Sequence, residues 1–175
     1  MTSVQTLSML RSSGRNITTP FHIVLPGGSE LLCRNILRLL PGKRVVALAE
    51  YNGNTVLAKL FFDTKNLQKE LDGYILLDKT GVATPLLLTN IGMGQGGICL
   101  YQFIENAETL DTLWQKSGAA KKTMLLEKLL PALQQCYQQQ VLQQDLHLGN
   151  FLLRDETLFV LDPASCKTFS NENEQ

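Results

Sequence analysis

Short runs of aliphatic and β-branched residues, separated by turn residues, fill the first hundred positions of the chain. The runs 44–51 and 56–62 flank Asn52-Gly53-Asn54, a sequence typical of a tight hairpin turn. Three further segments have the composition of strands, with a turn leading into the second of them: 21–25, 81–88 and 98–104. The pattern therefore predicts a small antiparallel sheet.

Two segments have the period of amphipathic helices. In 65–77, Leu67, Leu71 and Ile75 recur at four-residue steps, which predicts a helix whose apolar stripe faces the sheet. A longer helix is predicted from Ala119 to Leu142, with leucines along one broad face. Pro131 falls inside this second helix, so we expect a kink or a restart there.

Composition and charge narrow the class of protein. The hydrophobic content of 44% indicates a globular chain, and no apolar run approaches the ~20 residues that span a bilayer. Lys plus Arg equals Asp plus Glu at 16 each, so no overall basic field predicts a nucleic-acid partner. The four cysteines lack a C-x-x-C pair and predict reduced thiols in a cytoplasmic protein, with no zinc site: Cys33, Cys99, Cys136 and Cys166.

The candidate chemistry lies near the C-terminal end. Asp145 is followed five positions later by Asn150 and, after a predicted hairpin, by Asp162, twelve positions further on. Carboxylate and amide oxygens are ligands that Mg²⁺ prefers, and phosphoryl transfer needs one more carboxylate to orient the attacking hydroxyl. Asp, Asn and Gly are also common in turns, so this spacing alone leaves a purely structural interpretation open.

In this stretch the sequence resembles the protein-kinase-like superfamily, whose catalytic loop is H-R-D-x-x-x-x-N and whose metal ligand opens D-F-G. The local sequence D-L-H-L-G-N at 145–150 is similar to the D-L-H-x-x-N of small-molecule and lipopolysaccharide kinases. Two positions depart from the superfamily pattern. Gln143 stands where the usual His would be, and Asp162-Pro163-Ala164 replaces D-F-G.

Two charged residues upstream extend the resemblance. Lys59 lies in V-L-A-K, which is similar to V-A-I-K, and Glu70 follows eleven positions later in the first predicted helix. The resemblance implies that Lys59 binds the α and β phosphates of ATP and that Glu70 orients it. Judged by position alone, Lys59 on an exposed strand face and Glu70 on a solvated helix face beside Lys69 remain alternatives.

Other nucleotide contacts are implied in the same way. The strand 98–104 would run into the hinge that reads adenine, at Gln102, Phe103 and Ile104, and Leu40-Pro41-Gly42-Lys43-Arg44 would cover the phosphates. The segment Gly92–Gly97 matches G-x-G-x-x-G, but a strand follows it where a dinucleotide site needs a helix. We interpret that segment as a hairpin loop.

The resemblance covers roughly 36–164 and implies an α+β, protein-kinase-like bilobal fold. We expect a leader and first strand at 1–35, and an N-lobe with a small antiparallel sheet and one helix at 36–104. A partial, mostly helical C-lobe with the catalytic loop would occupy 105–175. Because only Pro163–Gln175 follow Asp162, we expect this second lobe to be truncated.

The resemblance is to the lipopolysaccharide kinases, which phosphorylate Kdo and heptose. It implies transfer of the γ-phosphate of ATP to a hydroxyl of a sugar or glycolipid acceptor, in the cytoplasm at the inner face of the inner membrane. Asp145 would be catalytic, and Asn150 and Asp162 would hold Mg²⁺. Two alternatives are a nucleotide-binding pseudokinase or inactive kinase fragment, and a compact protein Ser/Thr kinase. The acceptor, the activity and the oligomeric state stay open.

Overall fold

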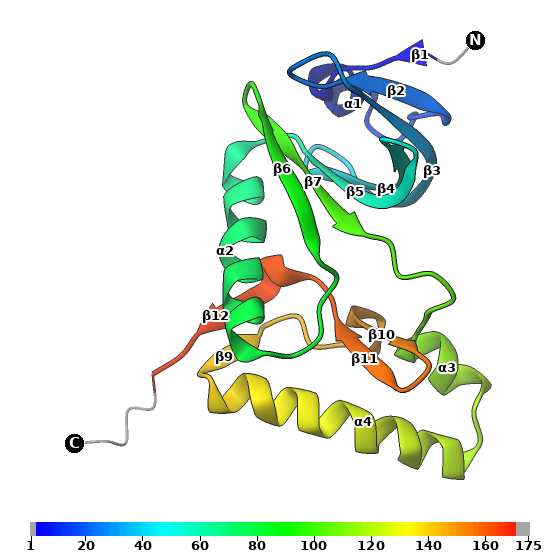
Figure 1. Cartoon of the computed structure of the whole chain (residues 1–175), viewed down its shortest axis with the longest axis vertical. Coiled ribbons are helices and arrows are strands. Elements are labelled where there is room, and N and C mark those ends of the chain that lie inside the picture. The colour runs from blue at the N-terminus through cyan, green and yellow to red at the C-terminus, as the bar shows by residue number, and fades with distance from the viewer. Residues whose placement is uncertain (1–2, 171–175) are drawn as a thin grey trace. The chain divides into compact units, whose positions relative to one another are not determined.

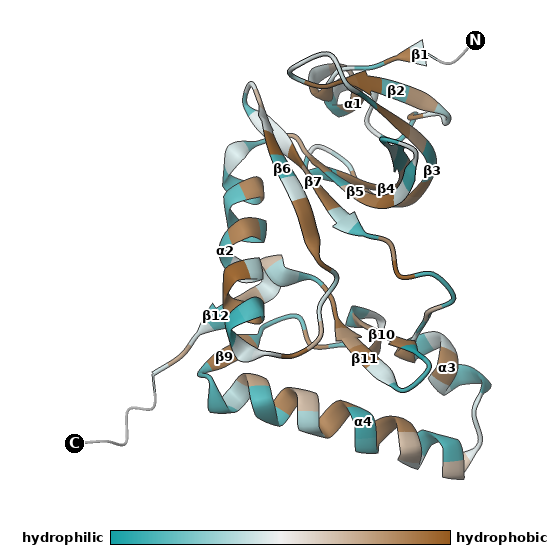
Figure 2. Cartoon of the chain, in the orientation of Figure 1, coloured by the Kyte–Doolittle hydropathy of each residue, from teal (hydrophilic) through white to brown (hydrophobic). Residues whose placement is uncertain are grey.

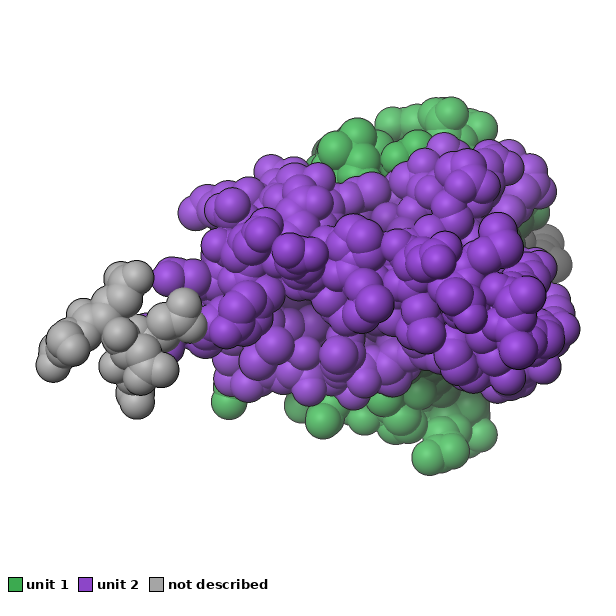
Figure 3. Space-filling view, turned by 90° about the horizontal axis from the view of Figure 1, so that it is seen from below, with its two compact units in different colours: residues 1–68, 86–103 green, residues 69–85, 104–175 purple. Residues whose placement is uncertain are grey.

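The computed structural model describes residues 3–170 and shows a mixed α and β protein (Figure 1). The chain divides into two compact units, each with its own core (Figure 3). Unit 1 comprises Met1–Gln68 and Leu86–Phe103, and unit 2 comprises Lys69–Pro85 and Ile104–Gln175. Within residues 3–170, no helix combines the length and the apolar character needed to cross a bilayer.

Unit 1 is built on a curled seven-stranded sheet with the order β1-β2-β3-β4-β5-β7-β6 (Figure 1). Neighbouring strands are antiparallel except for the parallel pair β1 and β2. The strands are β1 (Ser3–Val4), β2 (Phe21–Val24), β3 (Glu30–Leu40), β4 (Arg44–Tyr51), β5 (Asn54–Phe61), β6 (Leu87–Met93) and β7 (Gly96–Gln102).

The β4–β5 hairpin forms at the predicted place, for local reasons. Asn52 and Gly53 both have positive φ, at 49° and 77°, which is the backbone of a turn whose twist matches its flanking strands. Along β4, Val45, Ala47 and Ala49 are buried in the core of unit 1, as the two-residue period of a strand requires. The predicted hairpin is confirmed.

Helix α1 (Leu7–Ser13) packs into the same core, although the sequence analysis does not predict it. Thr6 caps it, since the Thr6 hydroxyl accepts a hydrogen bond from the Met9 amide at 3.2 Å. Leu7 and Leu10 are both buried against the sheet core. The segment expected as a leader thus contributes a packed helix, and β3 continues across position 35.

Unit 2 holds most of helix α2 (Thr64–Thr80), helices α3 (Leu110–Lys116) and α4 (Ala119–Gln138), and two small sheets. Thr109 caps α3, because its hydroxyl accepts from the Thr112 amide at 3.2 Å. The sheets have the orders β11-β10-β8 and β12-β9. Their strands are β8 (Glu108–Thr109), β9 (Val141–Gln143), β10 (Phe151–Arg154), β11 (Thr157–Val160) and β12 (Cys166–Thr168).

The buried face of α2 differs from the predicted one. Its buried positions are Glu70, Gly73, Leu77 and Thr80, whereas Ile75 of the expected stripe is 52% exposed. The expected stripe is wrong because it counted apolar residues only, while this helix buries a carboxylate and a glycine. Residues spaced by three and four positions share one helix face, so Glu70 lies at the start of the buried face.

Three other boundaries also need correction. Helix α4 is continuous with Pro131 inside it, so of the kink and the restart expected there the restart is wrong, and the helix ends at Gln138. Figure 2 shows apolar positions recurring along α4, but Leu126, Leu130 and Tyr137 are exposed. The strand expected to follow the turn within 81–88 begins only at Leu87, and the strand expected at 98–104 ends at Gln102.

All four cysteines are buried, and none of them is in a disulfide. Burial raises the pKa of the Cys33 thiol to about 12 in unit 1, and burial also raises the pKa of Cys166 to about 12 in unit 2. A buried thiol resists ionisation, so the stability it contributes is complete below its ordinary pKa of 9.0 and is lost as the pH rises toward 12.

We predict that Cys33→Ala makes the stability of unit 1 less dependent on alkaline pH. Between pH 8 and pH 10 the unmodified protein should lose about 1.4 kcal/mol more unfolding free energy than the variant, since only its unfolded chain ionises this thiol. Urea unfolding at both pH values measures the two losses. Equal losses in the two proteins would contradict the buried, neutral thiol.

Candidate active site

The predicted catalytic loop lies between β9 and β10 in unit 2. Asp145 follows β9 and is exposed, and Asn150 closes a 3₁₀ turn, Leu148–Asn150, where only 3% of it is exposed. The Asn150 Nδ2 atom donates a hydrogen bond to the Asp145 carbonyl at 2.7 Å. This bond fixes the orientation of the amide, so that Oδ1 is its remaining acceptor and the atom able to ligate a cation.

Asp162 follows the β10–β11 hairpin and adjoins the same loop. The amide of Leu161 donates to the Asn150 carbonyl at 2.8 Å, which places the residue before Asp162 beside the predicted catalytic loop. Asp162 has a left-handed backbone, with φ 56° and ψ 62°, a conformation that costs energy for a residue with a side chain. Its carbonyl accepts from the Ser165 amide at 3.2 Å and from the Ser165 hydroxyl at 2.9 Å, which stabilise the turn.

Gln143 links these two segments from the other side. Its Nε2 atom donates to the Leu161 carbonyl at 2.6 Å, and the residue is only 8% exposed. The residue that replaces the His of the superfamily pattern therefore holds the end of β9 next to the segment that carries Asp162. In the sequence, Gln143 stands out only as a departure from the His of the superfamily pattern. A side-chain hydrogen bond to a backbone carbonyl eighteen residues away leaves no pattern in the sequence.

Helix α2 approaches the turn after Asp162 at Gly73. A Cβ atom built on Gly73 would overlap the Pro163 carbonyl oxygen, so the two backbones are in direct contact. Glu70 lies one helical turn earlier on the same buried face and is 0% exposed, which excludes the solvated alternative for this residue. Burial is the largest cause of the raised pKa of Cys166, followed by Cys136 and then by the negative charges of Asp162 and Glu70. Both carboxylates therefore lie within electrostatic range of that thiol.

Gly73 is a site residue that the sequence analysis missed. Its signal is a glycine inside an amphipathic helix, three positions after the candidate Glu70, where alanine would favour the helix by about 1 kcal/mol. A glycine at such a position indicates a close packing contact, and the structure shows that this contact is with the Pro163 backbone.

Lys59 lies in unit 1, in the middle of β5. It pairs with Val46 of β4 and Cys99 of β7, and it is 9% exposed, so the alternative of a solvated strand face is not what the structure shows. Its Nζ atom lies 5.1 Å from the centre of the Tyr101 ring, within the range of a cation–π interaction.

The three expected hinge residues lie at the end of β7 and directly after it. The Gln102 amide donates to the Leu86 carbonyl at 2.8 Å, so this donor is already used within unit 1. Phe103 is half-buried and ends unit 1, whereas Ile104 is 5% exposed and begins the next segment of unit 2. An adenine base would therefore have to be read by other backbone groups of this segment.

The glycine-containing segments 40–44 and 92–97 each form the turn of a β-hairpin. Gly42, with φ +71°, lies in the exposed turn between β3 and β4, the predicted phosphate cover. Gly94, with φ +61°, turns β6 into β7. A Cβ on Gly96 would overlap the Phe61 carbonyl, and one on Gly97 would lie 2.7 Å from the Ile91 carbonyl. Tight packing explains Gly96 and Gly97, whereas a positive φ explains Gly42 and Gly94, and the interpretation of 92–97 as a hairpin loop is confirmed.

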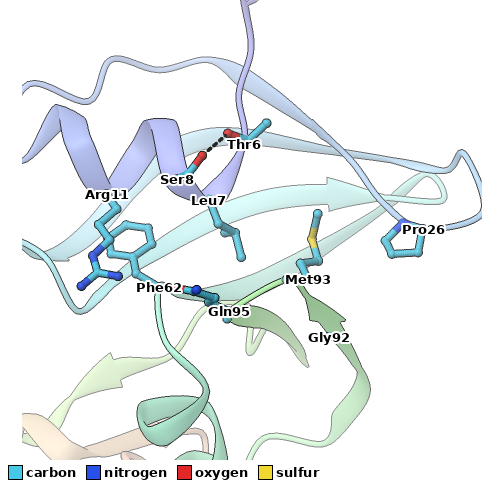
Figure 4. Close-up of a pocket in the computed structure, with 11 residues that line it drawn as sticks. Thr6, Leu7, Ser8, Arg11, Pro26, Phe62, Gly92, Met93 and Gln95 are labelled. Atoms are coloured by element: carbon cyan, nitrogen blue, oxygen red, sulfur yellow. Dashed lines mark hydrogen bonds between the residues drawn. The ribbon is translucent and has the colours of Figure 1, made fainter.

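This β6–β7 hairpin and α1 line a hollow of about 510 Å³ in unit 1 (Figure 4). Figure 4 shows Leu7 and Arg11 of α1 on one side and Met93 and Gln95 of the hairpin on the other. Arg11 is the one charged side chain among its lining residues. None of the predicted site residues lines this hollow, so cavity size alone does not locate the candidate chemistry.

The chemistry of the predicted metal ligands suits magnesium. Among residues 3–170, no cluster of three or more His, Cys, Asp or Glu side chains could hold an ion by itself. Asn150 and Asp162 offer one amide and one carboxylate oxygen. Such a sparse oxygen set fits Mg²⁺, which takes one or two protein carboxylates and completes its octahedron with water and substrate phosphates.

Comparisons with known proteins add no assignment. No model of a known protein family matches the chain, and no curated protein matches it.

We predict that Gly73→Ala destabilises the protein by about 2 kcal/mol, because the new methyl group must displace the Pro163 backbone. On an open helix face the same change would stabilise. Gly92→Ala is the control, since no atom lies within 4 Å of its added Cβ, and it should change stability by less than about 0.5 kcal/mol. Urea unfolding compares the variants, and a neutral or stabilising Gly73→Ala would disprove the backbone contact.

Proposed function

We propose that this protein is an ATP-dependent kinase with a protein-kinase-like bilobal fold. The observation that carries the proposal is the hydrogen-bond network of unit 2. Through the side chain of Asn150 the network holds Asp145, and through the Asn150 carbonyl it holds Leu161, the neighbour of Asp162. Phosphoryl transfer depends mainly on positioning and charge stabilisation, and this network supports two carboxylates and one amide for that purpose.

Asp145 is the proposed catalytic residue. Its backbone carbonyl is held by Asn150, while its side chain is 64% exposed and can meet an incoming acceptor. The acceptor hydroxyl oxygen would bond to the γ-phosphorus as the bond from that phosphorus to the β–γ bridging oxygen breaks, and ADP would leave. The hydroxyl proton passes to the Asp145 carboxylate.

Asn150 and Asp162 would hold Mg²⁺, which neutralises the charge that develops on the phosphates. The chain contributes to this by orientation. The Asn150 amide is fixed by its bond to Asp145, and the backbone of Asp162 is fixed by Ser165. Both ligands are thus supported by hydrogen bonds that do not depend on an ion.

Lys59 and Glu70 are assigned to the nucleotide phosphates. Both are charged residues with at most 9% exposure, and burial of charge costs free energy unless partners compensate for it. In the proposed role Lys59 binds the α and β phosphates and Glu70 orients the ammonium group. The adenine would be read by the segment Gln102, Phe103 and Ile104.

The acceptor is proposed to be a sugar or glycolipid, as in the lipopolysaccharide kinases, at the inner face of the inner membrane. This part of the proposal rests on the resemblance of D-L-H-L-G-N at 145–150. The residue that distinguishes this form, His147, has its Nε2 atom 3.7 Å from the Asp145 carboxylate, close enough to influence how that carboxylate is oriented.

We predict that Mg-ATP stabilises the protein by about 2.7 kcal/mol at 100 times its dissociation constant. Asp162→Asn should remove the magnesium-dependent part of this stabilisation. Asp155→Asn is a matched control, because Asp155 is exposed on the β10–β11 turn and shares a positive φ, 52° against 56°. Thermal melting with ATP, with and without Mg²⁺, gives the result. Equal behaviour of the two variants would remove Asp162 from the metal site.

Asp145→Asn should behave differently, since Asp145 acts on the acceptor and not on the nucleotide. We expect Mg-ATP affinity within about twofold of the unmodified protein, and phosphoryl transfer to a lipopolysaccharide core acceptor reduced by at least about 10²-fold. Calorimetric titration and a radiolabelled phosphate assay measure the two quantities. Binding of Mg-ATP without transfer by the unmodified protein would instead favour the pseudokinase alternative.

A further inference from the structure

The hollow of about 510 Å³ between α1 and the β6–β7 hairpin has no part in the proposed kinase chemistry. All of its lining residues belong to unit 1. Its apolar wall includes Leu7 and Phe62, which are 8% and 4% exposed, and the partly buried Met93. Small-molecule sites have volumes of about 300–1,000 Å³ and combine such a wall with a few polar groups. The hollow therefore has the size and the lining of a ligand site.

Arg11 is the one charged residue that lines the hollow, and it is exposed, so a ligand can reach its guanidinium group. Figure 4 shows Arg11 and Pro26 at opposite sides of the hollow, with Leu7 and Met93 between them in this view. A ligand that meets Arg11 with its charged end would therefore lay its body along apolar side chains.

Asp63 lies within electrostatic range of Arg11, but its carboxylate is engaged by Asn66. Its Oδ1 atom accepts from the Asn66 amide at 2.7 Å, and its Oδ2 atom accepts from Asn66 Nδ2 at 2.6 Å. Burial alone would raise the pKa of Asp63, but the bonds from Asn66 and nearby positive charges, among them Arg11, lower it below the ordinary value of 3.8. Within residues 3–170, the Arg11 side chain forms no hydrogen bond or close ion pair.

The charge of unit 1 also favours an anion. Its segments, 1–68 and 86–103, carry eight Lys and Arg against three Asp and Glu, a net charge of +5. Such a field attracts anions and repels cations. One guanidinium matches one carboxylate, which it can bind through two parallel hydrogen bonds. A phosphate monoester carries a charge of about −1.5 to −2 at neutral pH, so part of its charge would lack a partner at a single Arg.

We propose that this hollow is a binding site for a small apolar molecule with one carboxylate, which pairs with the Arg11 guanidinium. The wall of Leu7, Phe62 and Met93 selects the apolar body, and the single cation selects the single negative charge. This site is separate from the proposed nucleotide chemistry, and its test contains no nucleotide. A negative result would therefore leave the kinase proposal as it stands.

The test uses two probes of nearly the same shape, 2-naphthoate and 2-naphthamide. They share one ring system, but only naphthoate is charged at neutral pH. Charge-assisted hydrogen bonds to Arg11 should make naphthoate bind at least about tenfold more tightly. Titrations followed by the methyl resonances of labelled Leu and Met residues give both affinities. Leu7 and Met93 should shift, and Leu113 and Leu129 in the core of unit 2 should not.

Two pairs of variants separate the hollow from the general positive charge of unit 1. Arg11→Gln should reduce the affinity for naphthoate to that for naphthamide, and leave the affinity for naphthamide unchanged. Arg15→Gln removes an exposed cation outside the hollow, and should change naphthoate affinity by less than about twofold because salt screens exposed charges. Ser8→Trp places a large ring at the hollow and should weaken both probes, whereas Ser12→Trp, on the same helix but outside the hollow, should not.

Four results would each overturn the proposal. The first is an absence of naphthoate binding at millimolar concentration. The second is equal affinity for naphthoate and naphthamide, which would mean that the charge is not recognised. The third is naphthoate binding that Arg11→Gln and Arg15→Gln weaken equally, which would leave only the general field of unit 1. The fourth is 2-naphthyl phosphate binding more tightly than naphthoate, which would contradict a site for one negative charge. Because Arg11 is exposed, its substitution leaves the core of unit 1 intact.

Discussion

The contact between the backbone of α2 and the backbone that follows Asp162 is the constraint on which unit 2 depends. It exists because Gly73 has no side chain, and a single methyl group there would occupy the place of the Pro163 carbonyl oxygen. A glycine costs an exposed helix about 1 kcal/mol relative to alanine, so this close approach is obtained against the intrinsic preference of the helix. The contact fixes which face of α2 lies against this backbone. Glu70, one turn away on the same face, is buried on the side of α2 that packs against the turn after Asp162.

Hydrogen bonds from two amide side chains to backbone carbonyls hold the candidate catalytic segment. Asn150 and Gln143 each donate to a carbonyl, one before and one after the β10–β11 hairpin region. Amide side chains suit this purpose because they carry a donor and an acceptor on one rigid plane and stay neutral when buried. The left-handed backbone at Asp162 is a strained conformation, and Ser165 satisfies its carbonyl twice. The network thus stabilises a turn that would not form from local preference alone.

Local signals in the sequence were sufficient for the hairpin at Asn52-Gly53 and for the existence of α2 and α4. Each of these depends on residues within a few positions of one another. The buried face of α2 could not be predicted, because Glu70 and Gly73 are buried by partners far away in the sequence. Helix α1 was missed for a related reason: it is seven residues long, without an acidic first turn, and it is stabilised by packing of Leu7 and Leu10. For the candidate site, the sequence indicated Asp145, Asn150 and Asp162. It gave no indication of the part played by Gln143 and Gly73, which act through contacts to backbone atoms.

Gln143 shows how a buried polar side chain can support the turn before Asp162 at a cost. Its nitrogen donates to the Leu161 carbonyl, and its oxygen is buried without a hydrogen-bond partner among the described residues. An unpaired buried acceptor costs about 1–3 kcal/mol of desolvation, which is as much as one net hydrogen bond contributes or more. An apolar side chain at this position would avoid that cost, but it could not donate to the Leu161 carbonyl. The position of the segment before Asp162 therefore depends on a polar side chain that stability alone would not favour.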